Sequence, residues 1–445
     1  HLLCCEDRPE GQGGSVSGVG SLLVAGAGPK GIAIATKAAA LTAAGLPAPE
    51  VTVVDPLGVA GHWHGNSGYT DGRRQLGTRP EKDIGFPYLP SWGERSDEVS
   101  ARMRALSWHG FLMATQQLGV WVDRGCPRPT HGRWAEYITW AAETAGITVR
   151  RAKIGTVDRA GRSWLVDVGG DVIEADSLVF TGPGDALRLP GQPAEHPRIL
   201  DGRTVWQHLA GLPEKKIKTA CVIGGGETAG AITTALLEVL APSAQIELVS
   251  TEGVLFTRGE SFTENHMYTD PAVWLRLPER QRRAFIRRTD RGVFSVSVQS
   301  VLDQADRVHM VLGRVRRVHP GDDAVEIELD DGQDTHRVNY DLVVTAIGFD
   351  ALWWLSLFTE AAHDALAQAV GSSGRVETRD VERSIGFSLA VDNLTPALHL
   401  PVLAGLAQGP GFPNLSCLGL LADRVLQPCL TRESQPRQEC SATDV

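Results

Sequence analysis

Two stretches of the chain repeat the same order of apolar and polar positions. In the first, an apolar run at 22–25 precedes a glycine-rich turn, an alanine-rich segment at 32–44 and a second apolar run at 51–54. In the second, a run at 220–223 precedes another glycine-rich turn, a helical pattern over 227–240 and a run at 246–249. Short apolar runs bounded by turns are typical of buried strands, and alanine-rich segments favour helix. The pattern therefore predicts two strand–turn–helix–strand units.

The rest of the pattern places the second unit inside the first. Helices are expected over 98–118 and 133–145, and short strands over 147–157, 164–168, 172–175 and 178–180. The second unit closes with the apolar run 342–349, after which 350–369 reads as helical, 395–403 as strand and 417–426 as a last helix. Strands that alternate with helices predict an α/β fold with parallel sheets.

The first glycine-rich turn matches the pattern G-x-G-x-x-G, formed by Gly26, Gly28 and Gly31. In a dinucleotide fold the first glycine makes the tight turn, the second lets backbone approach a pyrophosphate, and the third lets the helix pack on the strand. The free N–H groups at the helix start face the anion, and Asp55 at the next strand end would bind ribose hydroxyls. We interpret this stretch as a dinucleotide site; the alternative is a glycine turn without a ligand.

The second glycine-rich turn reads G-x-G-x-x-A, formed by Gly224, Gly226 and Ala229. The strand that follows ends at Ser250 rather than at an acid. Because a carboxylate there would repel a 2′-phosphate whereas a hydroxyl accepts one, this end favours NADP over NAD. Arg258 is a candidate phosphate partner, and a surface arginine is an equally good interpretation.

The predicted fold class is α/β with two Rossmann-like dinucleotide-binding domains, an NADPH domain inserted into a FAD domain, plus a small, mostly helical substrate-binding region. We expect the FAD domain over 21–206 and 398–430, the NADPH domain over 207–350 and the helical region over 351–397. Residues 1–20 are expected to be a disordered extension without a signal peptide, and 431–445 a loose tail.

Composition excludes several function classes. The net charge of −10 argues against a nucleic-acid partner, and no apolar run approaches the ~18–20 residues of a membrane span. The seven cysteines are scattered, with neither a disulfide framework nor a zinc pattern. We expect a cytoplasmic protein with a small-molecule substrate; the sequence leaves a homo-oligomer open.

Two dinucleotide sites imply that NADPH reduces FAD. The reduced FAD could then pass its electrons on in three ways. Transfer to a disulfide needs a redox cysteine pair, usually C-x-x-C, and the sequence has none. Transfer to another protein or quinone stays open. Reaction with O2 to oxygenate a substrate needs a dry, closed pocket.

Six features together resemble the flavin-dependent N-hydroxylating monooxygenases of siderophore biosynthesis, the lysine N6- and ornithine N5-monooxygenases. They are the G-A-G-P of 26–29, Trp63-His64, Lys82-Asp83, the GGGETA of 224–229, Asn265 and the T-A-I-G-F of 345–349. The stretches TDGRRQLGTRPEKDIGFPY, LFTRGESF, RTDRGVFS and QGPGFPNLSCLGLL are most similar to the lysine enzymes of the mycobactin and nocobactin pathways.

This resemblance implies an activity. NADPH would reduce FAD, O2 would form a C4a-hydroperoxide, and the side-chain amine of L-lysine would take the distal oxygen. The family needs no metal, and the cofactor carries the chemistry while the protein positions the substrate and excludes water. L-ornithine is the alternative substrate, because one methylene is worth only ~1–3 kcal/mol.

The resemblance also assigns roles to positions. It makes Gln75, Lys82 and Asn265 the residues of the catalytic centre, with Gln75 near the flavin edge and Lys82 bound to the substrate carboxylate. Without the resemblance, Lys82 would be interpreted as a solvated charge and Asn265 as a loop asparagine. Trp63 and His64 would flank the flavin, or else be two packed loop aromatics. The expected cofactor-binding residues are Gly26, Gly28, Pro29, Lys30, Gly31, Asp55, Trp63, His64, Gln75, Thr181, Gly182, Gly224, Gly226, Glu227, Thr228, Ala229, Ser250, Arg258, Gly348, Pro413 and Leu415.

Asp290 stands where the ornithine enzymes carry a second substrate-contacting asparagine. A lysine amine has a pKa near ~10.4, so its neutral, reactive form already costs about 4 kcal/mol at neutral pH. A nearby carboxylate would raise that pKa further. We therefore expect Asp290 to face the substrate α-ammonium or to be structural, and the substrate-binding set to be Lys82, Asn265 and Asp290.

Two hypotheses from other functional classes remain open. An NADPH oxidase or diaphorase-like reductase would consume NADPH regardless of the amino acid and release peroxide. A flavin-binding partner protein without turnover would leave its flavin unbleached by NADPH.

Overall fold

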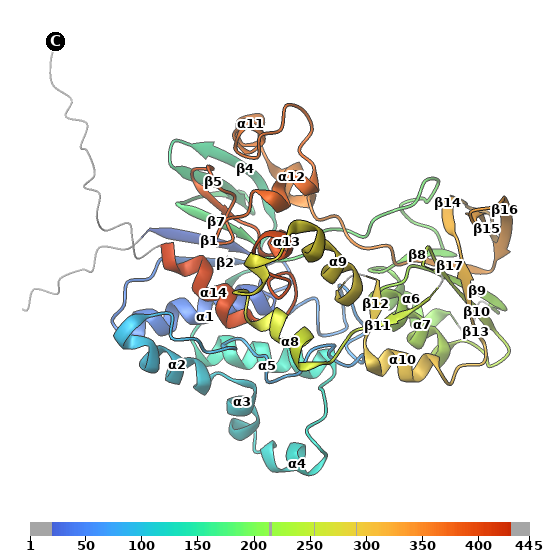
Figure 1. Cartoon of the computed structure of the whole chain (residues 1–445), viewed down its shortest axis with the longest axis horizontal. Helices are drawn as coiled ribbons and strands as arrows, with labels where there is room; N and C mark the ends of the chain where they lie inside the picture. Colours follow the sequence, from blue (N-terminus) through green and yellow to red (C-terminus); the bar gives the residue numbers. More distant parts are fainter. Residues whose placement is uncertain (1–19, 213–215, 253, 291, 429–445) are drawn as a thin grey trace, which may run out of the picture.

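The computed structural model describes residues 20–212, 216–252, 254–290 and 292–428. Two α/β units lie side by side: one built from the blue, cyan and red ends of the chain, the other from its green to orange middle (Figure 1). Except for Gly20, the predicted extension and the predicted tail lie outside the described residues. No helix in the described ranges is long and apolar enough to span a bilayer.

The first unit is built on a five-stranded sheet in which every pair is parallel. Its strands, in spatial order, are β18 (Ala397–His399), β7 (Ser177–Phe180), β1 (Ser21–Ala25), β2 (Glu50–Val54) and β3 (Val149–Arg150). The predicted strand at 395–403 is shorter than expected, because a 3-10 turn begins at Pro401. Because the strands are parallel, their carboxyl ends and the loops that follow them meet at one edge.

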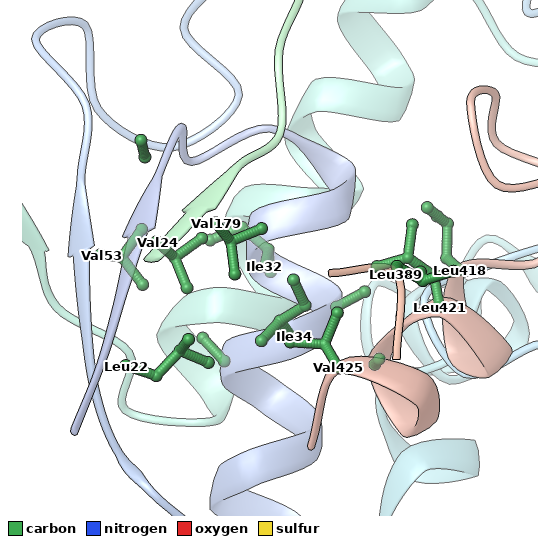
Figure 2. Packing of buried hydrophobic residues seen from close by; sticks show 14 of the residues in the cluster. Leu22, Val24, Ile32, Ile34, Val53, Val179, Leu389, Leu418, Leu421 and Val425 are labelled. Carbon is green, nitrogen blue, oxygen red and sulfur yellow. The ribbon is translucent and has the colours of Figure 1, made fainter. Parts of the chain in front are cut away.

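Helix α1 (Pro29–Ala43) is buried on two sides. Pro29 at its first position suits a helix start, and the alanine-rich sequence favours helix. In Figure 2, Ile32 and Ile34 lie between the apolar face of the sheet and α14 (Leu418–Leu426). The ammonium of Lys37, on the same helix, is buried and forms an ion pair with Asp423 of α14 at 2.7 Å. The last helix of the chain is therefore fixed to the first.

The second unit has its own five-stranded parallel sheet, inserted in the chain between β7 and β18. Its strands, in spatial order, are β13 (Val308–Leu312), β10 (Gln245–Ser250), β9 (Thr219–Ile223), β17 (Leu342–Thr345) and β8 (Ile199–Asp201). β8 pairs with β17, and Val205 and Trp206 join the same core. The second sheet therefore includes Ile199–Asp201, a segment that the sequence analysis had placed in the first unit.

Two small antiparallel sheets flank the parallel ones. They are β4 (Ile154–Ala160), β5 (Ser163–Val168) and β6 (Asp171–Ala175), and β14 (Arg314–His319), β15 (Val325–Asp330) and β16 (Thr335–Tyr340). The strand predicted over 147–157 is two strands in two sheets, β3 and β4. The helix predicted over 98–118 is also divided, into α2 (Ser96–Ala105) and α3 (Trp108–Ala114), because Ser107 caps the second one by accepting from the Gly110 N–H.

The remaining helices follow the alternating pattern. They are α4 (Leu118–Asp123), α5 (His131–Thr144), α6 (Val205–His208), α7 (Glu227–Val239), α8 (Phe262–Thr269), α9 (Glu279–Thr289), α10 (Val296–Leu302), α11 (Glu360–Ala369), α12 (Thr378–Arg383) and α13 (Gly405–Gln408). A short pair, β11 (Phe256–Thr257) and β12 (Val293–Phe294), joins the segments before α8 and α10.

The region 351–397, predicted to be mostly helical, contains α11, α12 and a 3-10 helix at Trp353–Leu357 joined by turns and loops, and it packs on the first unit. Trp354 stacks on Phe180 of β7 with ring centroids 5.8 Å apart, and Leu366 of α11 belongs to the core of the first sheet. The helical region is therefore part of the first unit's core.

Side chains from the first unit hold the second one in place. Arg74 forms two hydrogen bonds with the Glu238 carboxylate of α7, at 2.8 and 2.6 Å, and Arg128 pairs with Glu260 at 2.8 Å. Tyr69 meets Phe349, which follows β17, edge to face at 5.0 Å. These contacts fix how the loop after β2 lies against the second unit.

Candidate active site

A cavity of about 800 Å³ opens at the carboxyl ends of β1, β2 and β7. Its walls include many of the predicted cofactor residues, namely Gly26, Gly28, Pro29, Lys30, Asp55, Trp63, Thr181, Gly182 and Leu415. The site thus lies where ligands bind in open α/β sheets, beyond the carboxyl ends of the strands.

The first glycine loop is packed so tightly that side chains are excluded from two of its positions. A Cβ on Gly31 would lie 1.9 Å from the Gly26 carbonyl oxygen, and a Cβ on Gly26, whose φ is +111°, would lie 2.3 Å from Thr181 Oγ1. At Gly28, by contrast, a Cβ would meet nothing within 4 Å. Gly26 and Gly31 therefore serve the close approach of helix and strand, while Gly28 leaves open space on the cavity side.

Asp55 holds this loop in shape. One carboxylate oxygen accepts a hydrogen bond from the Ala27 N–H at 3.0 Å, and the other accepts one from the Leu57 N–H at 2.8 Å. Each oxygen of an ionised carboxylate has a second lone pair. The side chain can therefore fix the turn and still accept from a ligand hydroxyl.

A histidine that the sequence did not single out lines the middle of the cavity. His131, at the start of α5, shares a 2.7 Å hydrogen bond between its Nδ1 and Thr70 Oγ1, and its ring meets Trp63 edge to face at 5.0 Å. Burial lowers the pKa of His131 to about 4. The imidazole is therefore neutral at physiological pH and fixes the Trp63 ring.

The His131 pKa predicts acid sensitivity. Because the folded pKa, about 4, lies below the usual 6.5, the group stabilises the fold above pH 6.5, and this contribution is lost as pH falls toward 4. After a discount for partial solvent exposure, we expect wild type to lose about 2 kcal/mol more than His131→Gln between pH 7 and 4.5. Denaturant unfolding at both pH values measures this. Equal losses in wild type and His131→Gln would contradict the assignment.

The predicted substrate residues Lys82 and Asn265 are brought together, although 183 positions separate them. Lys82 Nζ lies 3.5 Å from Asn265 Oδ1. Asn265 lies on α8, whose start is fixed by Ser261, which accepts from the Glu264 N–H. Burial and the Arg258 charge lower the pKa of Lys82. A half-buried cation beside a second cation is a good site for an incoming carboxylate.

Asp290 and Arg258 belong to this same cluster. Asp290 Oδ1 lies 3.5 Å from an Arg258 guanidinium nitrogen and accepts a hydrogen bond from Asn414 Nδ2 at 3.3 Å. The guanidinium also lies 5.0 Å from the Tyr268 ring centroid. The partners seen for Arg258 are thus Asp290 and Tyr268 near Lys82, and its role as a phosphate partner stays a prediction.

Two predicted flavin neighbours do not line the cavity. Gln75 is exposed, because its segment pairs with 129–131 through Leu76 N–H to Pro129 O and His131 N–H to Arg74 O, and the alternation of extended backbone turns Leu76 inward. His64 is exposed as well, and His62 lines the cavity instead. Neither side chain lines the cavity, and the flavin contacts predicted for Gln75 and His64 stay predictions.

Other predicted cofactor residues lie close to the cavity without lining it. Gly348 precedes Phe349, which does line it, and Pro413 lies in the loop that carries Leu415. Pro413 instead faces a second cavity of about 220 Å³, which it shares with Asp290.

Several cavity residues escaped the sequence analysis. Tyr69 donates to the Gly184 carbonyl oxygen at 3.0 Å, and Arg203, ion-paired with Asp185, lies 5.7 Å from the Tyr69 ring centroid. His62 and Tyr69 lie in an aromatic-rich loop whose composition could have marked them. Nothing in the local sequence marks Arg203 or His131.

The second glycine loop joins β9 to α7. It carries the predicted residues Gly224, Gly226, Glu227, Thr228 and Ala229, and Ser250 at the end of β10 lies against it. Gly224 has φ +148° and packs against the Ala346 carbonyl oxygen, while the Glu227 carboxylate accepts from the Ser295 N–H. The loop therefore has the shape of the first one, with an acid at the helix start whose side chain accepts a backbone hydrogen bond.

Known proteins of similar sequence agree with this architecture. The sequence profile of the L-lysine 6-monooxygenase/L-ornithine 5-monooxygenase family matches residues 103–351. L-lysine N6-monooxygenase MbtG of Mycobacterium sp. (strain MCS) is 43% identical over 413 residues, which are 91% of this chain and 94% of that protein. The enzyme of the same name from Mycolicibacterium paratuberculosis is 40% identical over 94% of this chain and 97% of its own length.

A solved structure gives the same result in three dimensions. Lysine monooxygenase NbtG from Nocardia farcinica superimposes with a TM-score of 0.80 at 42% identity, covering 92% of this chain and 100% of its own. The two parallel-sheet units, the paired glycine loops and these similarities lead to one conclusion. The chain belongs to the L-lysine 6-monooxygenase/L-ornithine 5-monooxygenase family.

Proposed function

We propose that the protein hydroxylates the side-chain amine of L-lysine at N6, with FAD and NADPH as cofactors and O2 as co-substrate. One oxygen atom of O2 goes to the amine and the other leaves as water, while NADPH supplies two electrons: NADPH + O2 + H⁺ + R–NH2 gives NADP⁺ + R–NHOH + H2O. The product would serve hydroxamate siderophore synthesis. L-ornithine N5-hydroxylation is the alternative.

The contact between Lys82 and Asn265 is the observation that carries this proposal. Two polar side chains from distant segments meet at 3.5 Å. The charges of Lys82 and of the cavity residue Lys30 both act to lower the pKa of the Cys417 thiol, although burial raises it overall. An ammonium and an amide suit the carboxylate and α-ammonium of a free amino acid. The amine to be oxidised would then extend toward the cavity.

The cavity fits FAD in three respects. Gly28 leaves open space beside the N–H groups at the start of α1, Asp55 has free acceptor capacity, and Trp63 offers an aromatic wall. Bound FAD supplies the electron transfer and the activation of O2. The protein's own residues bind, orient and keep water away, which is the usual share of a protein when a cofactor carries the chemistry.

The choice of lysine rests on the relatives. Both bacterial enzymes compared above are named for L-lysine, at 40–43% identity over nearly the whole chain. An L-ornithine N(5)-monooxygenase from Ceriporiopsis subvermispora is 24% identical over 66% of this chain. We also propose a cytoplasmic location, supported by the free thiols of Cys126, Cys221 and Cys417 in the described part of the chain.

Asp290 positions the substrate-side loop in this account. Asp290→Asn removes the negative charge that pairs with Arg258. It also replaces one carboxylate oxygen, which accepts hydrogen bonds, with an amide nitrogen that donates them beside Asn414. Because these side chains are partly exposed, we expect a roughly threefold to tenfold rise in KM for lysine, with little change in peroxide release. The control is Asp306→Asn, which removes an exposed carboxylate of the second unit. An unchanged KM in the Asp290 variant would contradict the positioning role.

Steady-state assays with purified protein, FAD and NADPH test the proposal. We expect hydroxylamine formation to accompany NADPH oxidation with L-lysine, and much less product with L-ornithine. Dominant hydroxyornithine would assign the alternative substrate. NADPH oxidation that ignores the amino acid and yields equal peroxide would instead indicate an oxidase.

A further inference from the structure

Lys30 occupies a position that disfavours a cation. It is the second residue of α1, where the helix dipole is positive, and the first turn contains no acidic residue. The side chain is half-buried and lines the cavity, and burial lowers its pKa to about 8. Helix dipole and burial both raise the free energy of the charged form.

Two other lysines in the first unit, Lys37 and Lys82, have partners of a kind that Lys30 lacks. Lys37, seven residues later on α1, pairs with Asp423 at 2.7 Å, and Asp423 also accepts from the Ser91 hydroxyl and the Trp92 indole N–H. Lys82 has Asn265. Among the described residues, none forms a hydrogen bond or ion pair with Lys30 Nζ. An unpaired cation on a cavity wall indicates that its partner is an anion that binds in the cavity.

The neighbours of Lys30 show which end of the cavity it faces. Asp290 and Cys417 are the ionisable groups near enough to favour its charged form, and Cys417 is also near Lys82. Asp290, Lys82 and Cys417 belong to the substrate side of the site. Leu415, two residues before Cys417, lines the cavity. The pyrophosphate of a dinucleotide, by contrast, would be bound by the N–H groups at the start of the helix. Lys30 and Leu415 line the same cavity, and Asn414, next to Leu415, donates a hydrogen bond to Asp290 at 3.3 Å, so Lys30 shares the cavity with the loop that reaches the substrate side.

We propose that the Lys30 ammonium contacts the pyrimidine edge of the flavin ring and stabilises the anionic reduced cofactor. Reduction by NADPH delivers two electrons and one proton to the ring, which then carries one negative charge at that edge. A fixed cation there favours the reduced over the oxidised state and raises the two-electron potential. This inference rests on the proposed use of FAD and not on the identity of the amino acid.

The test is the reduction potential of bound FAD in the holoenzyme, measured anaerobically against an indicator dye. Lys30→Met keeps most of the side chain and removes the charge; we expect the preference for reduced over oxidised FAD to fall about tenfold, equivalent to a potential about 30 mV lower for a two-electron couple. Lys30→Arg should keep most of the wild-type potential. The apoprotein of Lys30→Met should be no less stable than wild type, because an unfavourable charge is lost, and Lys30→Gln replaces it if methionine impairs folding.

The matched control is Lys218→Met, which removes an exposed cation next to β9 that does not line this cavity. It should leave the potential unchanged. An unchanged potential in Lys30→Met, with oxidised and reduced FAD weakened equally, would mean that Lys30 binds the pyrophosphate and would overturn the inference. Unchanged potential and unchanged affinity would overturn it too. Since neither readout involves lysine or ornithine, failure here leaves the proposed substrate untouched.

Discussion

Replacing Lys82 with methionine is expected to raise KM for L-lysine roughly 10- to 100-fold. The ammonium would donate a charge-assisted hydrogen bond to the substrate carboxylate, and such bonds contribute about 1.5–3 kcal/mol. The carboxylate is remote from the reacting amine, so the interaction is equal in ground and transition states and kcat should change little. Initial rates of hydroxylamine formation over a range of lysine concentrations measure both constants.

Arg79→Met is the control for the Lys82 variant. Arg79 lies on the same loop but is exposed and paired with its neighbour Glu81 at 2.8 Å. This variant should retain the wild-type KM. If Lys82→Met also kept it, the carboxylate would bind elsewhere and the cluster around Lys82 would lose its assigned role.

Replacing Gly28 with alanine is expected to reduce FAD affinity roughly 10- to 100-fold while the apoprotein stays folded. The added methyl group meets no protein atom within 4 Å, and Gly28 has φ −74°, which alanine readily adopts. Replacing the N-cap glycine of α1 with alanine costs at most about 1 kcal/mol of stability. The space it fills is where a pyrophosphate would approach the helix N–H groups, so charge-assisted hydrogen bonds are lost. Equilibrium flavin fluorescence measures the affinity.

Gly31→Ala separates the two uses of glycine in this loop. Its methyl group would lie 1.9 Å from the Gly26 carbonyl oxygen and 3.3 Å from Val24 Cγ1, so α1 must move away from β1. We expect the free energy of unfolding of the apoprotein to fall by about 3 kcal/mol or more. If Gly28→Ala destabilised the apoprotein equally, or bound FAD normally, the cavity would not be the dinucleotide site.

The two units could be predicted from the sequence because their signals are local. Glycines at fixed spacing, apolar runs of strand length and an alanine-rich helix all point to the same structure, and local agreement of this kind specifies a fold. The predicted boundaries of the strands, helices and units were less accurate. β8 joins the second sheet through pairing with β17, and the helix break at Ser107 depends on a single cap. Pairing over more than a hundred residues leaves no local pattern.

The site was only partly accessible from the sequence. Resemblance singled out Lys82 and Asn265, which the fold brings together, whereas spacing alone would not have connected them. Gln75 is exposed because the face that a residue presents in an irregular loop depends on backbone pairing, here between 74–76 and 129–131. For Arg258 the sequence left two interpretations open, a phosphate partner and a surface arginine, and its ion pair with Asp290 at the end of α9 was not predicted.

The most direct test of the proposed oxygen transfer is a turnover experiment under ¹⁸O2 with NADPH and L-lysine, followed by mass spectrometry of the product. The account predicts N6-hydroxylysine that carries one ¹⁸O atom, formed in proportion to the NADPH consumed. Hydroxylysine without label, or NADPH consumption that yields peroxide and no hydroxylated lysine, would contradict it.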